Sequence, residues 1–211
     1  MDGGGSMSSE AYALPLIQVC SAATRRALLD FAIEHVQSVG IETLLARQVD
    51  ERDWYTQTDL MDPTGKSDEA LRQNLPVLVR FGVFDIRDPD ATFKHYGVAH
   101  NDVIATLASW NGIRVTELLA TSARQKIVTF FLERSDPEES YSMTAIETAA
   151  DMSFYGVSDN IDALADAGLV AEVEGARGTE YTLDTDEPLH AFLYRLNEVL
   201  YEANAQRADM L

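Results

Sequence analysis

Polar and basic side chains that could bind a nucleic acid gather between residues 66 and 94 of the chain. Arg72 and Gln73 lie on the predicted outward face near the start of a helix expected over about residues 67–81. Arginine pairs bidentately with guanine and glutamine with adenine, so both are candidates for reading base edges. The flanking residues are candidates for phosphate contacts, namely Lys66, Ser67, Arg80, Arg87 and Lys94.

The matching stretch later in the chain, residues 153–167, has a different character, with three aspartates and no Lys or Arg. Phe154 and Tyr155 are predicted at its exposed start, where aromatic side chains beside acids favour a protein-binding face. Contact with DNA stays open as an alternative. In that case Tyr155 would touch a thymine methyl, Ser158 would lie on the DNA-facing side, and Arg177 at a hairpin tip would enter a minor groove.

Sequence patterns for catalysis and cofactor binding give no match. The stretch TGKS at 64–67 is not a phosphate loop, because the required first glycine falls on Leu60 and no strand precedes it. The histidines at 35, 95, 100 and 190 form no metal-spaced pair with a cysteine, and no G-x-S-x-G elbow is present. We therefore predict no enzyme, no cofactor and no metal site.

Both stretches belong to a weak internal repeat with an offset of 86 residues, in which residues 55–58 match 141–144 and Gly82 matches Gly168. Each copy predicts a helix, a short second helix, a turn, a third helix and a β-hairpin, with no gap in the alignment. The first copy has helices over about 38–48, 56–61 and 67–81, and strands over 83–86 and 92–96. The second has helices over about 122–134, 144–150 and 154–167, and strands over 169–173 and 180–183.

Two amphipathic helices flank the repeats, over residues 22–39 and 187–206. The second helix carries a long apolar stripe that would pack on its own domain or on a second subunit. We predict a homodimer in which this stripe lies across a two-fold axis. Its expected interface residues are Leu189, Phe192, Leu196 and Leu200.

The charge of the chain is unusual: 35 acidic and 16 basic residues give a net charge of −19, and only three of the basic residues are lysines. Such a charge opposes binding to a polyanion in dilute buffer. In concentrated salt the Debye length falls to about 3 Å at 1 M, so self-repulsion nearly vanishes. The acidic residues are spread along the chain, which favours adaptation to high salt over an ordinary acidic tail.

The remaining sequence features indicate a cytoplasmic protein. One cysteine, Cys20, excludes an internal disulfide. No apolar run is long enough to cross a membrane, and the start of the chain lacks the pattern of a signal peptide. Residues 1–21, with the stretch GGGS, are predicted as a flexible tail.

The segment MTAIETAADMSFYGVSDNIDALADAGLV resembles the helix-turn-helix of archaeal winged-helix transcription regulators, broadly those like MarR, ArsR and halophage repressors. The matching positions are Ile146, Ser153, Val157, Ile161, Leu164, Gly168, Leu169 and Val170. The pattern departs at Glu147, where a small residue is usual, and at Asp159, where a basic or polar contact residue is usual.

The resemblance implies two tandem winged-helix domains, at 22–113 and 114–211, in a mainly α fold with small β-hairpin wings and flanking terminal helices. It implies a sequence-specific regulator that binds double-stranded DNA, here from a haloarchaeal-like, salt-rich cytoplasm. The alternative is a tandem winged-helix module that binds other proteins, like chromosome-condensation accessory factors or general transcription factors. The acidic second copy favours this alternative, whereas Lys66, Arg72 and Gln73 favour the regulator.

Overall fold

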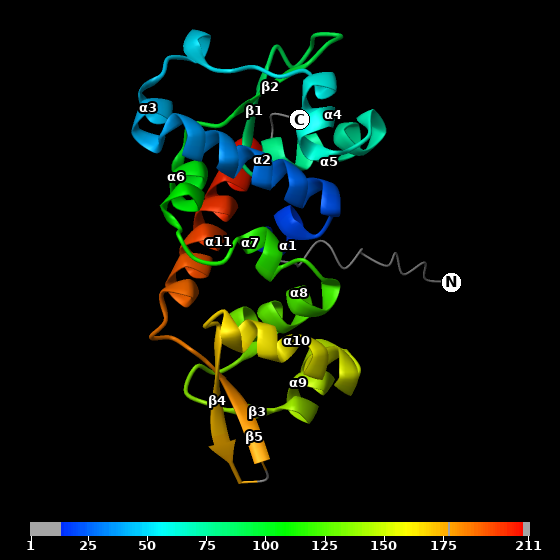
Figure 1. Ribbon diagram of the computed structural model, residues 1–211, viewed down its shortest axis with the longest axis vertical. Coiled ribbons are helices and arrows are strands. Elements are labelled where there is room, and N and C mark those ends of the chain that lie inside the picture. The colour runs from blue at the N-terminus through cyan, green and yellow to red at the C-terminus, as the bar shows by residue number, and fades with distance from the viewer. Residues whose placement is uncertain (1–13, 177, 209–211) are drawn as a thin grey trace, which may run out of the picture.

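The computed structural model describes residues 14–176 and 178–208, and it is mainly helical with two small antiparallel sheets (Figure 1). This confirms the predicted mainly α fold with small hairpins. The two hairpins lie toward opposite ends of an elongated molecule, and the C-terminal helix α11 (Pro188–Arg207) runs along the region between them.

In the first half, helix α2 packs against the two helices that precede the first hairpin. The elements are α2 (Ala23–Val39), α4 (Gln57–Thr64), α5 (Asp68–Arg80), β1 (Phe84–Arg87) and β2 (His95–Val98). The predicted second and third helices are therefore present. The second strand begins at His95 rather than at residue 92, because residues 88–94 form the hairpin loop.

The predicted first helix of this half, over 38–48, is present only over Ile41–Ala46, and it does not have the predicted place as the first helix of the repeat. Gly40 has φ of +85° and ends α2, and a separate short helix, α3 (Ile41–Ala46), follows. The helix that packs on α4 and α5 is α2, so α2 corresponds to the first helix of the second half. The ungapped repeat therefore fails before Tyr55, since α3 and the 3-10 turn η2 (Val49–Glu51) are extra elements.

The second half follows the same order and matches its prediction closely. Its elements are α8 (Ser122–Thr129), the π-helical turn η3 (Phe130–Arg134), β3 (Tyr141–Ser142), α9 (Met143–Ala150), α10 (Phe154–Asp166), β4 (Val170–Gly175) and β5 (Gly178–Leu183). Strand β3 pairs with β5 and makes a three-stranded sheet. In the first half the matching residue, Tyr55, forms a single antiparallel bridge with Tyr96.

Each third helix begins and packs for the same reasons. The hydroxyls of Ser67 and Ser153 accept hydrogen bonds from the backbone N–H groups of Ala70 and Gly156, so they cap α5 and α10. Residues spaced three and four apart then form one buried apolar face on each helix. These residues are Leu71, Leu75 and Leu78 on α5, and Val157, Ile161 and Leu164 on α10.

The N-terminal prediction needs a correction. Residues 1–13 lie outside the described part of the chain, but the rest of the expected flexible tail forms helix α1 (Pro15–Cys20). Leu16, Val19 and Cys20 of this helix are buried, and α1 packs on α2 and α11. Burial of these apolar side chains explains why the segment is ordered.

The predicted dimer stripe also needs a correction. Leu189, Phe192, Leu196 and Leu200 of α11 are all buried within one chain, where α11 packs on α1, α5 and α6 (Asp102–Ser109). These four side chains are therefore not available to a second subunit. Helix α11 belongs in sequence to the second half, yet it packs along the first half, as does the short α7 (Val115–Leu118) on α2.

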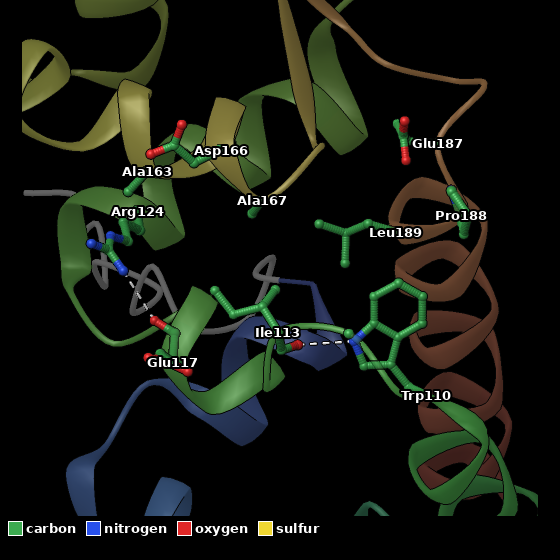
Figure 2. Close-up of a pocket in the computed structure, with 11 residues that line it drawn as sticks. Trp110, Ile113, Glu117, Arg124, Ala163, Asp166, Ala167, Glu187, Pro188 and Leu189 are labelled. Atoms are coloured by element: carbon green, nitrogen blue, oxygen red, sulfur yellow. Dashed lines mark hydrogen bonds between the residues drawn. The ribbon is translucent and has the colours of Figure 1, made fainter.

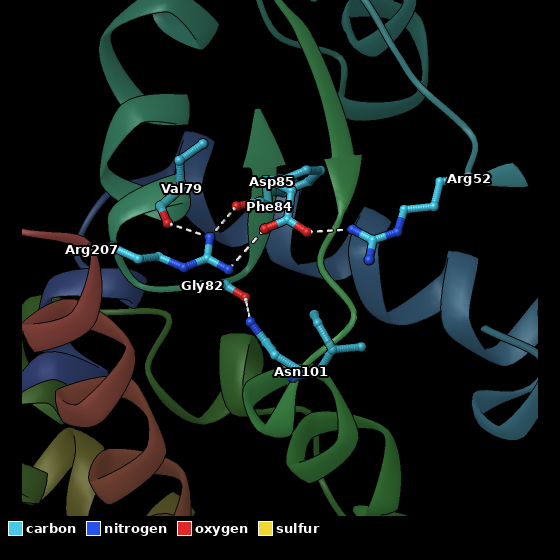
Figure 3. A network of polar contacts seen from close by, with 8 residues as sticks. Arg52, Val79, Gly82, Phe84, Asp85, Asn101 and Arg207 are labelled. Carbon is cyan, nitrogen blue, oxygen red and sulfur yellow. Dashed lines mark hydrogen bonds and ion pairs between the residues drawn. The ribbon is translucent and has the colours of Figure 1, made fainter. Parts of the chain in front are cut away.

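A polar network fixes the end of α11 to the base of the first hairpin (Figure 3). Asp85 of β1 accepts hydrogen bonds from Arg52 at 2.6 Å and from Arg207 at 2.8 Å. Arg207 also donates to the backbone carbonyl oxygens of Val79 and Phe84. The side chains of Arg52 and Arg207 are each 16% exposed, so the ion pairs are partly shielded from water.

Candidate nucleic-acid interface

The first candidate surface is built on the turn between α4 and α5. Thr56 and Asp59 form a reciprocal capping box that begins α4, and hydrogen bonds from Thr56 hold the pKa of Asp59 below its usual value. Gly65 ends α4 in the left-handed conformation, with φ of +62°. Three residues later α5 begins, so the two helices are joined by a tight turn typical of a helix-turn-helix.

The face of this unit borders a groove of about 490 Å³ between the two helices and the loop of the first hairpin. Helix α5 contributes Arg72, and the hairpin loop contributes Lys94. Of the predicted DNA-contacting residues, these two are the ones that line the groove. The groove residues are Thr56, Gln57, Thr58, Asp68, Arg72, Pro76, Thr92, Phe93, Lys94 and Tyr96.

Arg72 and Gln73 share one partner. The Arg72 guanidinium donates to both carboxylate oxygens of Glu69, the shorter contact being 2.6 Å, and the Gln73 amide donates to the same carboxylate at 2.6 Å. These hydrogen bonds lower the pKa of Glu69 and raise the pKa of Arg72. The Arg72 side chain is 65% exposed. An ion pair this exposed contributes little stability, so a phosphate or a base can replace Glu69 as its partner.

The other predicted contacts of the first half lie around the groove rather than in it. Lys66 and Ser67 occupy the turn before α5. Arg87 ends β1, where its guanidinium lies 5.9 Å from the Trp54 ring centroid and 3.9 Å from the Asp88 carboxylate. Arg80 lies at the opposite end of α5 and donates to Asn204 of α11 at 2.5 Å. Arg80 is thus engaged with α11, away from the groove.

The other eight groove residues were not predicted as contacts, and two of them, Phe93 and Gln57, have unusual surroundings. Phe93 was assigned to a strand, yet it lies in the hairpin loop and is 79% exposed. Gln57, at the start of α4, has a buried side-chain nitrogen without a hydrogen-bond partner in the described part of the chain. For Phe93, the sequence did contain a usable signal, namely an apolar residue between a predicted loop and a basic residue. No sequence pattern marks Gln57, because its surroundings come from three separate elements.

The second candidate surface lies at the start of α10. Phe154 is 43% exposed and Tyr155 is 77% exposed, and their rings meet edge to face with centroids 6.1 Å apart. Ser158 is half-buried on the same helix, and Asp159 is exposed. Arg177 lies outside the described residues. The surface therefore presents aromatic rings beside carboxylates, without a nearby lysine or arginine on α10.

A third hollow, of about 510 Å³, lies where the two halves meet (Figure 2). The Trp110 indole donates to the backbone oxygen of Ile113 and stacks on Phe192 with ring centroids 4.6 Å apart. Arg124 donates to the backbone oxygen of Glu117. Three carboxylates against one guanidinium line this hollow, those of Glu117, Asp166 and Glu187. It therefore disfavours phosphate and is not an extension of the groove beside α5.

Comparisons with protein-family models, with curated proteins and with solved structures gave no significant match. Within the described residues, no helix combines the length and the apolar character needed to cross a membrane. The same residues contain no cluster of three or more His, Cys, Asp or Glu side chains placed to hold a metal ion.

Proposed function

We propose that this chain is a tandem winged-helix regulator that binds double-stranded DNA through its first half and works in a concentrated-salt cytoplasm. The order of elements supports the tandem arrangement. Each half has a helix, an extended segment, two helices joined by a turn, and a hairpin. The extended segment pairs with the hairpin in both halves, through β3 and β5 in the second and through Tyr55 and Tyr96 in the first.

The observation that carries the proposal is the convergence of Arg72 and Lys94 on one groove. Arg72 lies in the N-terminal part of α5, the part of a recognition helix that meets base edges in the major groove. Lys94 comes from the hairpin beside it, where a phosphate contact is expected. Two cations from separate elements thus face the same side in a chain of net charge −19.

The high net charge sets the conditions under which this binding occurs. In dilute buffer the acidic surface repels the phosphate backbone over a screening length of about 30 Å at 0.01 M salt. At molar salt that length is about 3 Å, so contacts between Arg72 or Lys94 and DNA act almost alone. Affinity for DNA should therefore fall little, or rise, with added salt. For a basic DNA-binding protein, the logarithm of the binding constant falls with the logarithm of the salt concentration, with a slope of about −0.9 for each neutralised phosphate.

The test is selection of duplexes from a random library at about 2 M potassium chloride, followed by binding titrations with the selected sequence. Arg72→Ala should weaken binding by roughly 5- to 150-fold, the worth of about 1–3 kcal/mol for one bidentate contact, and relax preference at one base pair. The matched control is Arg195→Ala. Arg195 makes the same i,i+3 ion pair at 2.6 Å, with Glu198, on the outer face of α11.

Recovery of no preferred duplex between about 0.1 and 2 M salt would overturn the proposal. Equal losses in Arg72→Ala and Arg195→Ala would remove Arg72 from the interface. Melting temperature over the same range tests the salt adaptation, because unscreened carboxylates should destabilise the fold in dilute buffer. A flat melting temperature with a steeply negative binding slope would contradict that adaptation.

A second candidate function, binding of a partner protein, is favoured by the surface at the start of α10. Two exposed aromatic rings beside carboxylates suit a protein contact better than a phosphate-facing one. Homodimerisation also stays a proposal, since a two-fold dimer matches a palindromic DNA site. It requires a surface other than the buried stripe of α11. A monomer observed by light scattering, at micromolar protein concentration in molar salt, would contradict the dimer.

A further inference from the structure

Phe93 is the most exposed large apolar side chain among the described residues, at 79% of its surface. It lies in the seven-residue loop between β1 and β2. The second hairpin has no such loop, since only two residues separate β4 from β5. The longer loop of the first hairpin thus presents an aromatic ring that the second hairpin lacks.

The base of this hairpin is held firmly. Asp85 is fixed between Arg52 and Arg207, and Tyr55 exchanges two backbone hydrogen bonds with Tyr96, each of 2.8 Å. The loop itself turns at Asp88, which has φ of +51° and whose carbonyl accepts from the N–H of Ala91 at 2.9 Å. Phe93 therefore lies in a loop whose flanking strands are held in place.

The surroundings of the ring define what it can meet. Lys94 follows it directly, and Arg72 lines the same groove. Arg87 lies at the other end of the loop. The carboxylates near these cations belong to Glu69, which pairs with Arg72, to Asp68 in the groove, and to Asp88 and Asp90 in the loop, where Asp88 pairs with Arg87. An apolar ring flanked by cations complements a duplex, which offers phosphates outside and stacked bases inside.

We propose that Phe93 is a wedge that enters the minor groove beside the site read by α5 and partly unstacks one base step. This inference rests on the proposed function and extends it to the shape of the bound DNA. Apolar side chains inserted in this way kink a duplex by about 20–90°. Unstacking is easiest at pyrimidine–purine steps, so the selected DNA should carry a TA or CA step beside the α5 site.

The experiment uses the full chain and a duplex recovered by selection, at about 2 M potassium chloride. The fluorescent base 2-aminopurine is placed at each step beside the selected site in turn, since its emission rises when it loses stacking. Energy transfer between dyes at the duplex ends reports the bend. The variants are Phe93→Ala and, as a control, Tyr201→Ala, which removes an exposed aromatic ring (64% exposed) from α11.

The wild-type chain and Tyr201→Ala should raise 2-aminopurine emission at one step and shorten the end-to-end distance. Phe93→Ala should lose both signals, while its affinity changes less than about tenfold because the cost of unstacking disappears together with the contact. Bending that persists in Phe93→Ala, or no unstacking by the wild type, overturns the wedge while the proposed function stands. Failure of the wild-type chain to bind any duplex overturns the proposed function instead, and the wedge with it.

Discussion

The two halves of this chain have the same order of helices and hairpin but carry different side chains on their surfaces. Residues 56–97 contain seven acidic and five basic residues, a net charge of −2. The matching residues 142–183 contain eight acidic residues and one basic residue, a net charge of −7. At the positions of Arg72 and Gln73, the second half carries Ser158 and Asp159. A fold is set by its buried residues, so its surface is free to take on different partners.

The halves also differ in how their hairpins are held. In the first half, Asp85 joins the hairpin to Arg52 and Arg207, and the third strand is reduced to the Tyr55 bridge. In the second half the matching position is Ala171, and the two-residue strand β3 supports the hairpin instead. Ion pairs in one half thus replace strand pairing in the other, which leaves the first hairpin fixed to α11.

The largest expected effect should be the same in both halves. Leu78 of α5 and Leu164 of α10 are matching positions, and both are fully buried. Leu78→Ala and Leu164→Ala should each reduce the free energy of unfolding by about 2–5 kcal/mol, because each leaves a cavity. Denaturant unfolding in molar salt measures this, and a loss in only one variant would show that the halves do not share a common core design.

The next effect should appear in the first half alone. Asp85→Ala leaves Arg52 and Arg207 facing each other without their shared carboxylate. Breaking a fully buried ion pair costs about 3–5 kcal/mol, and partial exposure of these side chains reduces the expected loss to about 1–3 kcal/mol. The control, Glu198→Ala, removes an exposed pair and should cost much less, because surface ion pairs contribute little stability. Equal losses in both variants would show that the network does not anchor the hairpin.

A double substitution in α10 tests whether side-chain identity alone accounts for the difference between the two candidate surfaces. Ser158→Arg combined with Asp159→Gln gives α10 the side chains of Arg72 and Gln73. If charge is the difference, the double variant should bind the selected duplex about tenfold more tightly, a gain of about 1.4 kcal/mol. Unchanged affinity in binding titrations would mean that the missing loop of the second hairpin matters more than its charge.

The smallest effect concerns pH and His35, which lies behind the first hairpin. Its ring contacts Tyr55 at 3.3 Å and Asp53 at 3.6 Å. Burial lowers the pKa of His35 below its usual 6.5; Asp53 opposes this shift and Arg47 adds to it. The unfolded chain therefore binds the proton more readily, and stability present above pH 6.5 is lost as pH falls toward the folded pKa.

Unfolding of the wild type and of His35→Gln, followed between about pH 8 and pH 5, measures this contribution. Burial also lowers the pKa of His100 and His190, so both proteins should lose stability in acid. The loss should be smaller in His35→Gln. A steeper loss in the variant would reverse the sign assigned to His35.

Much of the secondary structure could be predicted from local patterns. Ser67 and Ser153 mark helix starts, and apolar residues at helical spacing mark the faces of α5, α10 and α11 that the structure buries. The start of α3 was predicted too early because Gly40, which ends α2, lay inside the helix predicted over 38–48. The order in α1 was missed because it depends on packing against α2 and α11, which are distant in sequence.

The sequence by itself determined the types and faces of most helices and the contrast in charge between the halves, because these depend on residue identity and local spacing. Only the tertiary structure decided which apolar faces are covered within one chain, since that depends on which elements meet. It showed that the apolar stripe of α11, which was predicted as a dimer surface, is buried in the core of a single chain. It also showed that Arg72, Phe93 and Lys94 line one groove, whereas Arg80 contacts α11. Side chains from separate elements converge only after the helices and the hairpin pack, so the sequence could not show this.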